Sequence, residues 1–229
     1  MKRFILALSG IAAMLVSCCG PKDGEYTFRL LTTNDVHGRY FDSLYVADAT
    51  DNALTNISWY ADSLRAAEGA ENVILLDDGD CLQGDNAAYY FNFVDTLSEH
   101  VFSRIAEYMG YDAVVAGNHD ICFKQWDTYL ETFKTSVYYF IVETPLGQKD
   151  LFIMYDSADG TLGKKQLQWM RNTLEWASKQ NFRHIVAGSH THFFMRDNSQ
   201  GIATNYSIEE TYTLLRLFQS HGIDILFTG

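Results

Sequence analysis

Apolar runs of strand length alternate with stretches of helical periodicity along most of this chain. Runs typical of buried strands lie at 26–31, 72–80, 111–120, 136–144, 149–157, 182–190 and 223–227. Helical spacing of apolar residues occurs at 53–68, 93–109, 163–180 and 207–219. Because helices and sheets that alternate in this way pack as layers, the sequence predicts an α/β fold with mixed sheets.

Side chains that bind metals follow four of these runs directly. They are Asp35 and His37, then Asp80, then Asn118 and His119, and finally His190 and His192. In α/β sheets, ligands gather outside the carboxyl ends of strands, so we expect these side chains to share one site. Carboxylate, imidazole and amide groups suit zinc, manganese or iron better than calcium or copper.

The motifs that carry these residues are D-x-H, G-D and G-N-H-D, in this order along the chain. They resemble the motifs of the calcineurin-like metallophosphoesterases, and the resemblance covers about residues 26–229. It implies a four-layer α/β/β/α sandwich with two mixed β-sheets. It also implies hydrolysis of phosphomonoesters, with nucleotides among the candidate substrates, by a dinuclear metal centre. The alternative is that the motifs are unrelated loop turns and capping residues.

The resemblance implies a role for each matching residue. The implied metal ligands are Asp35 and His37 on one ion, Asp80 between the two ions, and Asn118 and His190 on the second ion. His119 is the implied catalytic residue, which would contact the phosphate and protonate the leaving group. Two divalent ions of zinc, manganese or iron would clamp the phosphoryl oxygens and lower the pKa of a water molecule.

Parts of the chain depart from the family pattern. In the nucleotidase branch an acid lies three residues after the catalytic histidine, but Cys122 occupies this position here. We interpret His190 as the family's lone histidine and His192 as a bystander, because a serine separates Gly188 from His190. The final run, GIDILFTG, resembles the strand before the last family motif, G-H-x-H. The catalytic domain at 26–229 is therefore predicted to be incomplete at its C-terminal end.

The two halves of the chain resemble different branches of the family. TTNDVHGRYFDS and LLDDGDCLQGDNAAYYFN resemble secreted 5'-nucleotidases, which usually carry a further C-terminal domain that grips the nucleoside. From GNHDICFKQW onward, with YDSADGTLGKKQLQWMRNTL, the chain resembles single-domain members related to purple acid phosphatases. A true hybrid, a divergent member and an artificial join of two sequences all fit this pattern.

The N-terminus has the features of a secreted bacterial lipoprotein. Lys2 and Arg3 precede an apolar stretch at 4–16 that is short for a membrane span. The stretch ends in Leu-Val-Ser-Cys, which resembles a lipobox. We therefore predict a signal peptide at 1–17, lipidation of Cys18, a linker at 18–25 and anchoring in the cell envelope, facing the periplasm or the cell surface. An ordinary signal peptide with chance cysteines is the alternative.

The net charge and the cysteine count of the chain limit the partners and the covalent cross-links that it can have. The formal net charge of -12 disfavours nucleic-acid polymers, whose binding depends on neutralisation of phosphates by Lys and Arg. A small phosphorylated substrate stays compatible, since bound metal ions supply positive charge. If Cys18 carries lipid, three of the four cysteines remain, which indicates no disulfide framework. The rival function is a non-catalytic lipoprotein that keeps some metal ligands.

Overall fold

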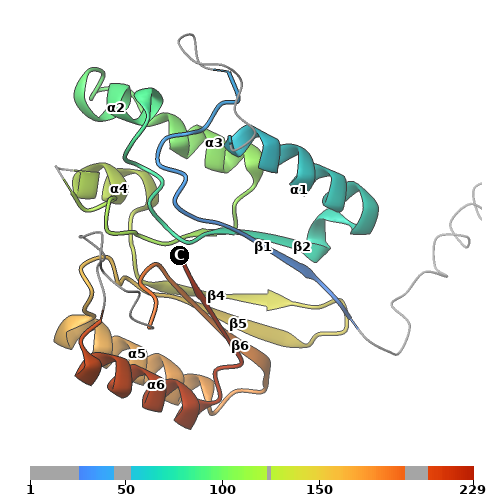
Figure 1. Ribbon diagram of the computed structural model, residues 1–229. Helices are drawn as coiled ribbons and strands as arrows, with labels where there is room; N and C mark the ends of the chain where they lie inside the picture. The colour runs from blue at the N-terminus through green and yellow to red at the C-terminus, as the bar shows by residue number, and fades with distance from the viewer. Residues whose placement is uncertain (1–25, 44–52, 123–124, 194–205) are drawn as a thin grey trace, which may run out of the picture.

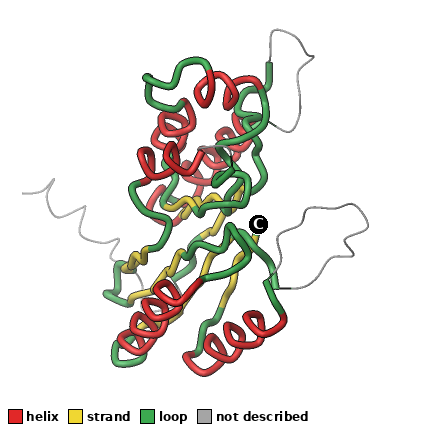
Figure 2. Tube along the Cα trace, turned by 90° about the vertical axis from the view of Figure 1, so that its left-hand side faces the viewer, coloured by secondary structure: helices red, strands yellow, loops and turns green. Residues whose placement is uncertain are grey.

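The computed structural model describes residues 26–43, 53–122, 125–193 and 206–229. Two sheets lie face to face, and helices cover the outer face of each sheet (Figure 1). Figure 2 shows the strands between the two sets of helices. The predicted α/β/β/α sandwich is confirmed. The predicted signal peptide at 1–17, Cys18 and the linker at 18–25 lie outside the described residues.

The first sheet has the strand order β1-β2-β3, and its described strands all run parallel. They are β1 (Arg29–Thr33), β2 (Val73–Asp77) and β3 (Ala113–Val114). The helices on its outer face, within the described ranges, are α1 (Leu54–Glu68), α2 (Asn86–Phe93), α3 (Val101–Met109) and α4 (Gln125–Phe133), and the short 3-10 helix η1 (Ala70–Asn72) leads into β2. Because the strands are parallel, their carboxyl ends meet at one edge of the sheet.

The second sheet is mixed and has the order β4-β5-β6-β7. Its strands are β4 (Tyr138–Glu143), β5 (Lys149–Met154), β6 (Phe182–Ser189) and β7 (Ile225–Thr228). β4 pairs antiparallel with β5, as expected for the predicted strand pair, and the other pairings are parallel. Helices α5 (Gly163–Ala177) and α6 (Ile208–His221) lie on its outer face.

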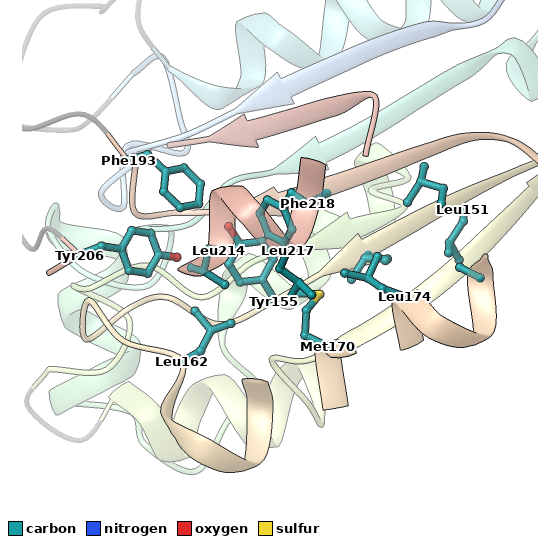
Figure 3. Close-up of a cluster of buried hydrophobic side chains, with 14 residues drawn as sticks. Leu151, Tyr155, Leu162, Met170, Leu174, Phe193, Tyr206, Leu214, Leu217 and Phe218 are labelled. Atoms are coloured by element: carbon teal, nitrogen blue, oxygen red, sulfur yellow. The ribbon is translucent and has the colours of Figure 1, made fainter. Parts of the chain in front are cut away.

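Apolar side chains fill the spaces between the four layers. Ile74 and Leu76 of β2 lie between the two sheets with Phe152 and Met154 of β5, whereas Leu75 packs toward the helices of the first sheet. Strands buried on both faces need apolar residues at consecutive positions, which explains the unbroken runs in the sequence. The cluster under α5 and α6 is shown in Figure 3 and includes Leu151, Tyr155, Met170, Leu174, Leu214 and Phe218.

The helix predicted at 93–109 is wrong in its first half. α2 ends at Phe93 and α3 begins at Val101. Val94 and Leu97 are 63% and 98% exposed, so they do not continue the buried face of α3. His100 ends the break, because its Nδ1 accepts a hydrogen bond from the backbone N–H of Phe102 at 3.2 Å and caps α3.

Two smaller differences concern the region that follows α3. β3 covers only Ala113–Val114 of the run predicted at 111–120, and farther along this run the N–H of Gly117 donates to the Asp120 carboxylate at 2.9 Å and not to a strand. Helix α4 has no counterpart among the predicted elements.

None of the helices in the described ranges combines the length and the apolar character that a membrane span requires.

Candidate metal centre

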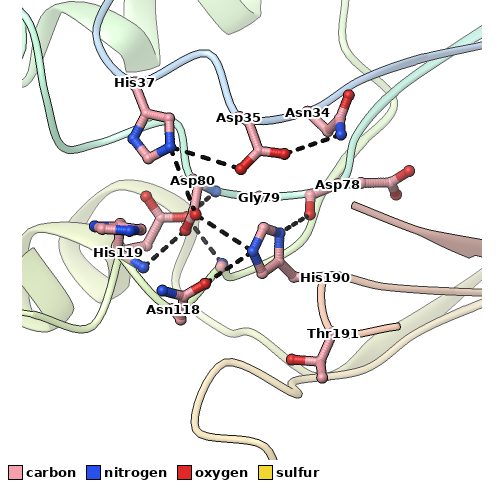
Figure 4. A network of polar contacts seen from close by, with 12 residues as sticks. Asn34, Asp35, His37, Asp78, Gly79, Asp80, Asn118, His119, His190 and Thr191 are labelled. Carbon is pink, nitrogen blue, oxygen red and sulfur yellow. Dashed lines mark hydrogen bonds and ion pairs between the residues drawn. The ribbon is translucent and has the colours of Figure 1, made fainter. Parts of the chain in front are cut away.

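The loops that follow β1 and β2 are joined by backbone hydrogen bonds at the carboxyl edge of the first sheet. The N–H of Asp35 donates to Gly79 O at 3.0 Å, and the N–H of His37 donates to Asp80 O at 2.9 Å. The N–H of Asp78 donates to Thr33 O at 2.7 Å. These bonds bring two motifs that lie far apart in the sequence into one site (Figure 4).

Three candidate ligands lie in left-handed backbone conformations. The φ angles are 51° at Asp35, 48° at His37 and 61° at Asp80. Lys134 is the one other non-glycine residue with positive φ in the described part of the chain. Such residues cost of order 1–3 kcal/mol each and persist only when the surrounding structure imposes them. The backbone bonds between the two loops supply that constraint.

Gly117 allows the third motif to approach Asp80 closely. A Cβ atom at position 117 would lie 2.2 Å from Asp80 Oδ1 and 2.4 Å from Asp80 N, which no side chain could accept. Next to it, the backbone N–H of His119 donates to Asp80 Oδ1 at 2.7 Å. The glycine of the G-N-H-D motif is therefore needed for contact between the loop after β3 and the loop after β2.

Asp80 lies at the centre of two groups of potential metal ligands. One group is His37, Asp80 and His119, and the other is Asp35, Asp80 and His190. In each group, one candidate ligand atom per residue lies within 4.8 Å of those of the other two residues. Asp80 is 1% exposed, so its carboxylate has almost no contact with water. A buried carboxylate beside three imidazoles and a second carboxylate has the donor chemistry of a divalent metal centre.

Short distances show that the predicted metal ligands lie together in the structure. Asp80 Oδ2 lies 3.3 Å from His190 Nε2 and 3.8 Å from His37 Nε2. His190 Nε2 is 3.0 Å from Asn118 Oδ1, so Asn118 joins the second group. His37 Nε2 is 3.6 Å from Asp35 Oδ1. The assignment of each residue to one ion stays a prediction, as does the catalytic role of His119.

His190 reaches the site from the second sheet. Its Nδ1 lies 2.8 Å from Asp78 O, which directs Nε2 toward Asp80 and Asn118. Gly229, after β7, donates its N–H to His190 O at 2.9 Å, so the end of the chain also lies beside this site. His192 belongs to neither ligand group. The expectation that a G-H-x-H motif continues from Gly229 stays a prediction.

Carboxylates make the site favourable for positive charge. Contact with His37 lowers the pKa of Asp35, and the same contact raises the pKa of His37. Burial alone would lower the pKa of His190, but interactions with Asp80 and with the Asp78 carbonyl outweigh it and raise this pKa to about 9. The protonated forms of His37 and His190 are therefore favoured, and a divalent ion would be attracted by the same negative charge.

Asp120 contacts the backbone of the candidate site, and no spacing in the sequence predicts these contacts. Its fully buried carboxylate accepts hydrogen bonds from Asp80 N at 2.9 Å, Leu82 N at 2.7 Å and Gly117 N at 2.9 Å. It therefore holds the backbone of both loops that carry Asp80 and Asn118. The G-N-H-D motif contains Asp120, but the sequence does not show which groups it contacts.

Cys122, at the position of the nucleotidase acid, takes another partner. Its Sγ lies 3.1 Å from Asn118 O, to which it can donate a hydrogen bond. Cys81 is buried, and both thiols are free.

A cavity of about 880 Å³ opens beside the site. The site residues Asp35 and His37 line the cavity, together with Asn34, Arg39 and Asp85. Arg39 Nε lies 3.9 Å from Asp85 Oδ2. The cavity has room for a small organic molecule attached to a phosphoryl group.

Comparisons with known proteins give a family and a fold. A family model described as calcineurin-like phosphoesterase matches residues 28–229. The structure is similar to calcineurin-like phosphoesterase YfkN from Bacillus subtilis, with a TM-score of 0.59 and 18% identity, covering 88% of this chain and 71% of that chain. It is also similar to a candidate 5'-nucleotidase from Staphylococcus aureus, with a TM-score of 0.61 and 20% identity. This likeness covers 87% of this chain and 44% of that chain. No curated protein matches the sequence.

Proposed function

The chain belongs to the calcineurin-like phosphoesterase family, and from this premise we propose that it is a phosphomonoesterase with a dinuclear metal centre. The family supports metal-dependent hydrolysis of phosphoesters in general. The single observation that carries the finer proposal is the position of Asp80. Its buried carboxylate belongs to both candidate ligand groups, as a bridging ligand must.

The proposed ligands divide between the two ions as the family pattern implies. Asp35 and His37 bind one ion and Asn118 and His190 bind the other, with Asp80 between them. Their donor atoms already lie within a few ångströms of one another, and both imidazoles contact the Asp80 carboxylate. When bound, divalent ions would neutralise phosphoryl oxygens and lower the pKa of a water molecule. Zinc, manganese and iron all suit this donor set.

His119 is the proposed acid for the leaving group. Its ring packs edge-on against that of His37 at 4.8 Å between centroids, and it belongs to one of the two candidate ligand groups. Its backbone N–H is held by Asp80 Oδ1 at 2.7 Å. A positioned general acid contributes about 10²–10⁴-fold to the rate. His119→Ala should therefore lower kcat by about that factor on a substrate with a poor leaving group.

Nucleotides are the proposed substrate class. The fold similarity to a candidate 5'-nucleotidase from Staphylococcus aureus supports this proposal, and so does the cavity beside Asp35 and His37. We further propose that lipid on Cys18 anchors the protein in the cell envelope. The support for the anchor is the N-terminal sequence alone.

A hydrolysis assay tests the proposed activity. The protein expressed from its complete gene is loaded with Mn²⁺ or Zn²⁺ and given p-nitrophenyl phosphate and nucleoside monophosphates. We expect phosphate release that a chelator abolishes and that added metal restores. Metal binding without release from any substrate would contradict the phosphatase and support the non-catalytic rival. Release from p-nitrophenyl phosphate alone would contradict only the nucleotide specificity.

A further inference from the structure

The ring of His119 has a side-chain partner that is not an acid. Its Nδ1 is hydrogen-bonded to the side-chain Oε1 of Gln83, which lies in the loop after β2. An amide oxygen only accepts hydrogen bonds, so in this contact Nδ1 carries the proton and donates it. The other ring nitrogen, Nε2, is then left for a substrate. We propose that Gln83 is the residue that positions His119 for protonation of the leaving group, an inference that rests on the proposed function.

No carboxylate among the described residues takes this role. Asp80 accepts from the backbone N–H of His119, not from its ring. The carboxylate of Asp120 is occupied by three backbone N–H groups. Cys122, which stands where the nucleotidase branch has an acid, contacts Asn118 O instead. Among the described residues, the Gln83 amide is therefore the side chain that is hydrogen-bonded to His119 Nδ1.

The contacts of the loop around Gln83 fix its backbone. The preceding residue, Leu82, is buried, and its N–H donates to Asp120 at 2.7 Å. The backbone of Gln83 also hydrogen-bonds the His37 ring. The next residue, Gly84, packs so tightly that a Cβ there would lie 2.2 Å from His37 O. A side chain on a backbone fixed from both sides loses little further freedom when it orients a ring.

A neutral amide suits this position electrostatically. Asp35 and Asp80 already surround the imidazoles with negative charge. A further carboxylate at position 83 would add another charge next to His37 and His119. An amide orients the ring without changing the net charge on which metal binding depends.

Substrates with different leaving groups test the positioning role. Phenyl phosphate has a leaving group that needs a proton, whereas 2,4-dinitrophenyl phosphate has one that leaves without it. Loss of a residue that orients a ligand or catalytic group typically costs about 10–100-fold. We expect Gln83→Leu to lower kcat by about this factor on phenyl phosphate, with little change on 2,4-dinitrophenyl phosphate. The metal content should stay at the wild-type level.

Gln83→Glu separates the hydrogen bond from the charge, because it keeps an acceptor oxygen at the same distance along the side chain and adds a negative charge. It should recover most of the activity on phenyl phosphate that Gln83→Leu loses. An equal loss on both substrates, or a loss of metal, would show a structural role and overturn the inference. Unchanged kcat on phenyl phosphate would overturn it as well. If the wild-type protein hydrolyses neither substrate, the proposed function itself fails, which is a separate result.

Discussion

Acid should destabilise this protein through His100, the residue that caps α3. His100 is 4% exposed, and its Nδ1 accepts the N–H of Phe102. Its Nε2 is buried and has no hydrogen-bond partner among the described residues. The rings of Tyr40 and Phe91 pack edge-on against it. Because Nδ1 accepts this hydrogen bond, the neutral ring carries its proton on Nε2, and a second proton would go to Nδ1 and break the cap. Burial lowers the pKa of His100 from 6.5 to about 4.

The size of the destabilisation follows from the difference between the pKa of His100 in the unfolded chain, 6.5, and in the folded protein, about 4. Because the folded-state pKa lies below the unfolded one, the unfolded chain binds more protons between about pH 6.5 and pH 4. Stability is therefore lost as the pH falls through this window. The loss from His100 reaches about 2 kcal/mol at pH 5 and about 3 kcal/mol below pH 4.

Urea unfolding of the wild type and of His100→Asn measures this contribution. Asparagine keeps a side-chain oxygen that can cap α3, but it does not titrate. At pH 7.5 the variant should be the less stable protein, because it loses the packing of the buried ring. At pH 5 its deficit should be smaller by about 2 kcal/mol. A difference between the two proteins that stays constant from pH 7.5 to pH 5 would refute the reasoning.

Three further changes test the site and the anchor. Asp80→Asn should remove most of the bound metal, since Asp80 belongs to both ligand groups, whereas the exposed Asp42→Asn should not. Equal metal content by elemental analysis would contradict the bridging role. Gly117→Ala should lower the melting temperature and the metal content together, because its Cβ would lie 2.2 Å from Asp80 Oδ1. Gly222→Ala, whose Cβ would meet nothing within 4 Å, should keep its metal, and similar metal losses in both variants would count against this explanation. Cys18→Ala should shift the protein from the membrane pellet to the soluble fraction, and an unchanged pellet would exclude the anchor.

Much of the layered fold could be predicted from the sequence, because the responsible patterns are local. The runs at 72–80 and 149–157 contain the unbroken apolar stretches 73–76 and 151–155, because β2 and β5 are buried on both faces. The helix predicted at 163–180 is present as α5, and its apolar residues Met170 and Leu174 are buried against the second sheet. The segment at 94–100 was not predictable in this way, because Leu97 fits the helical spacing and yet is exposed.

The sequence by itself also determined which residues could form the site. Side chains just after parallel strands lie at one edge of a sheet, so Asp35, Asp80 and Asn118 could be brought together from motif order alone. Only the tertiary structure decided how the site is supported. Asp120 holds the N–H of Asp80 across 40 residues, and Gln83 holds the ring of His119 across 36 residues. Such contacts depend on how two loops meet after the sheet has formed, and the local spacing of residues in the sequence does not indicate which loops will meet.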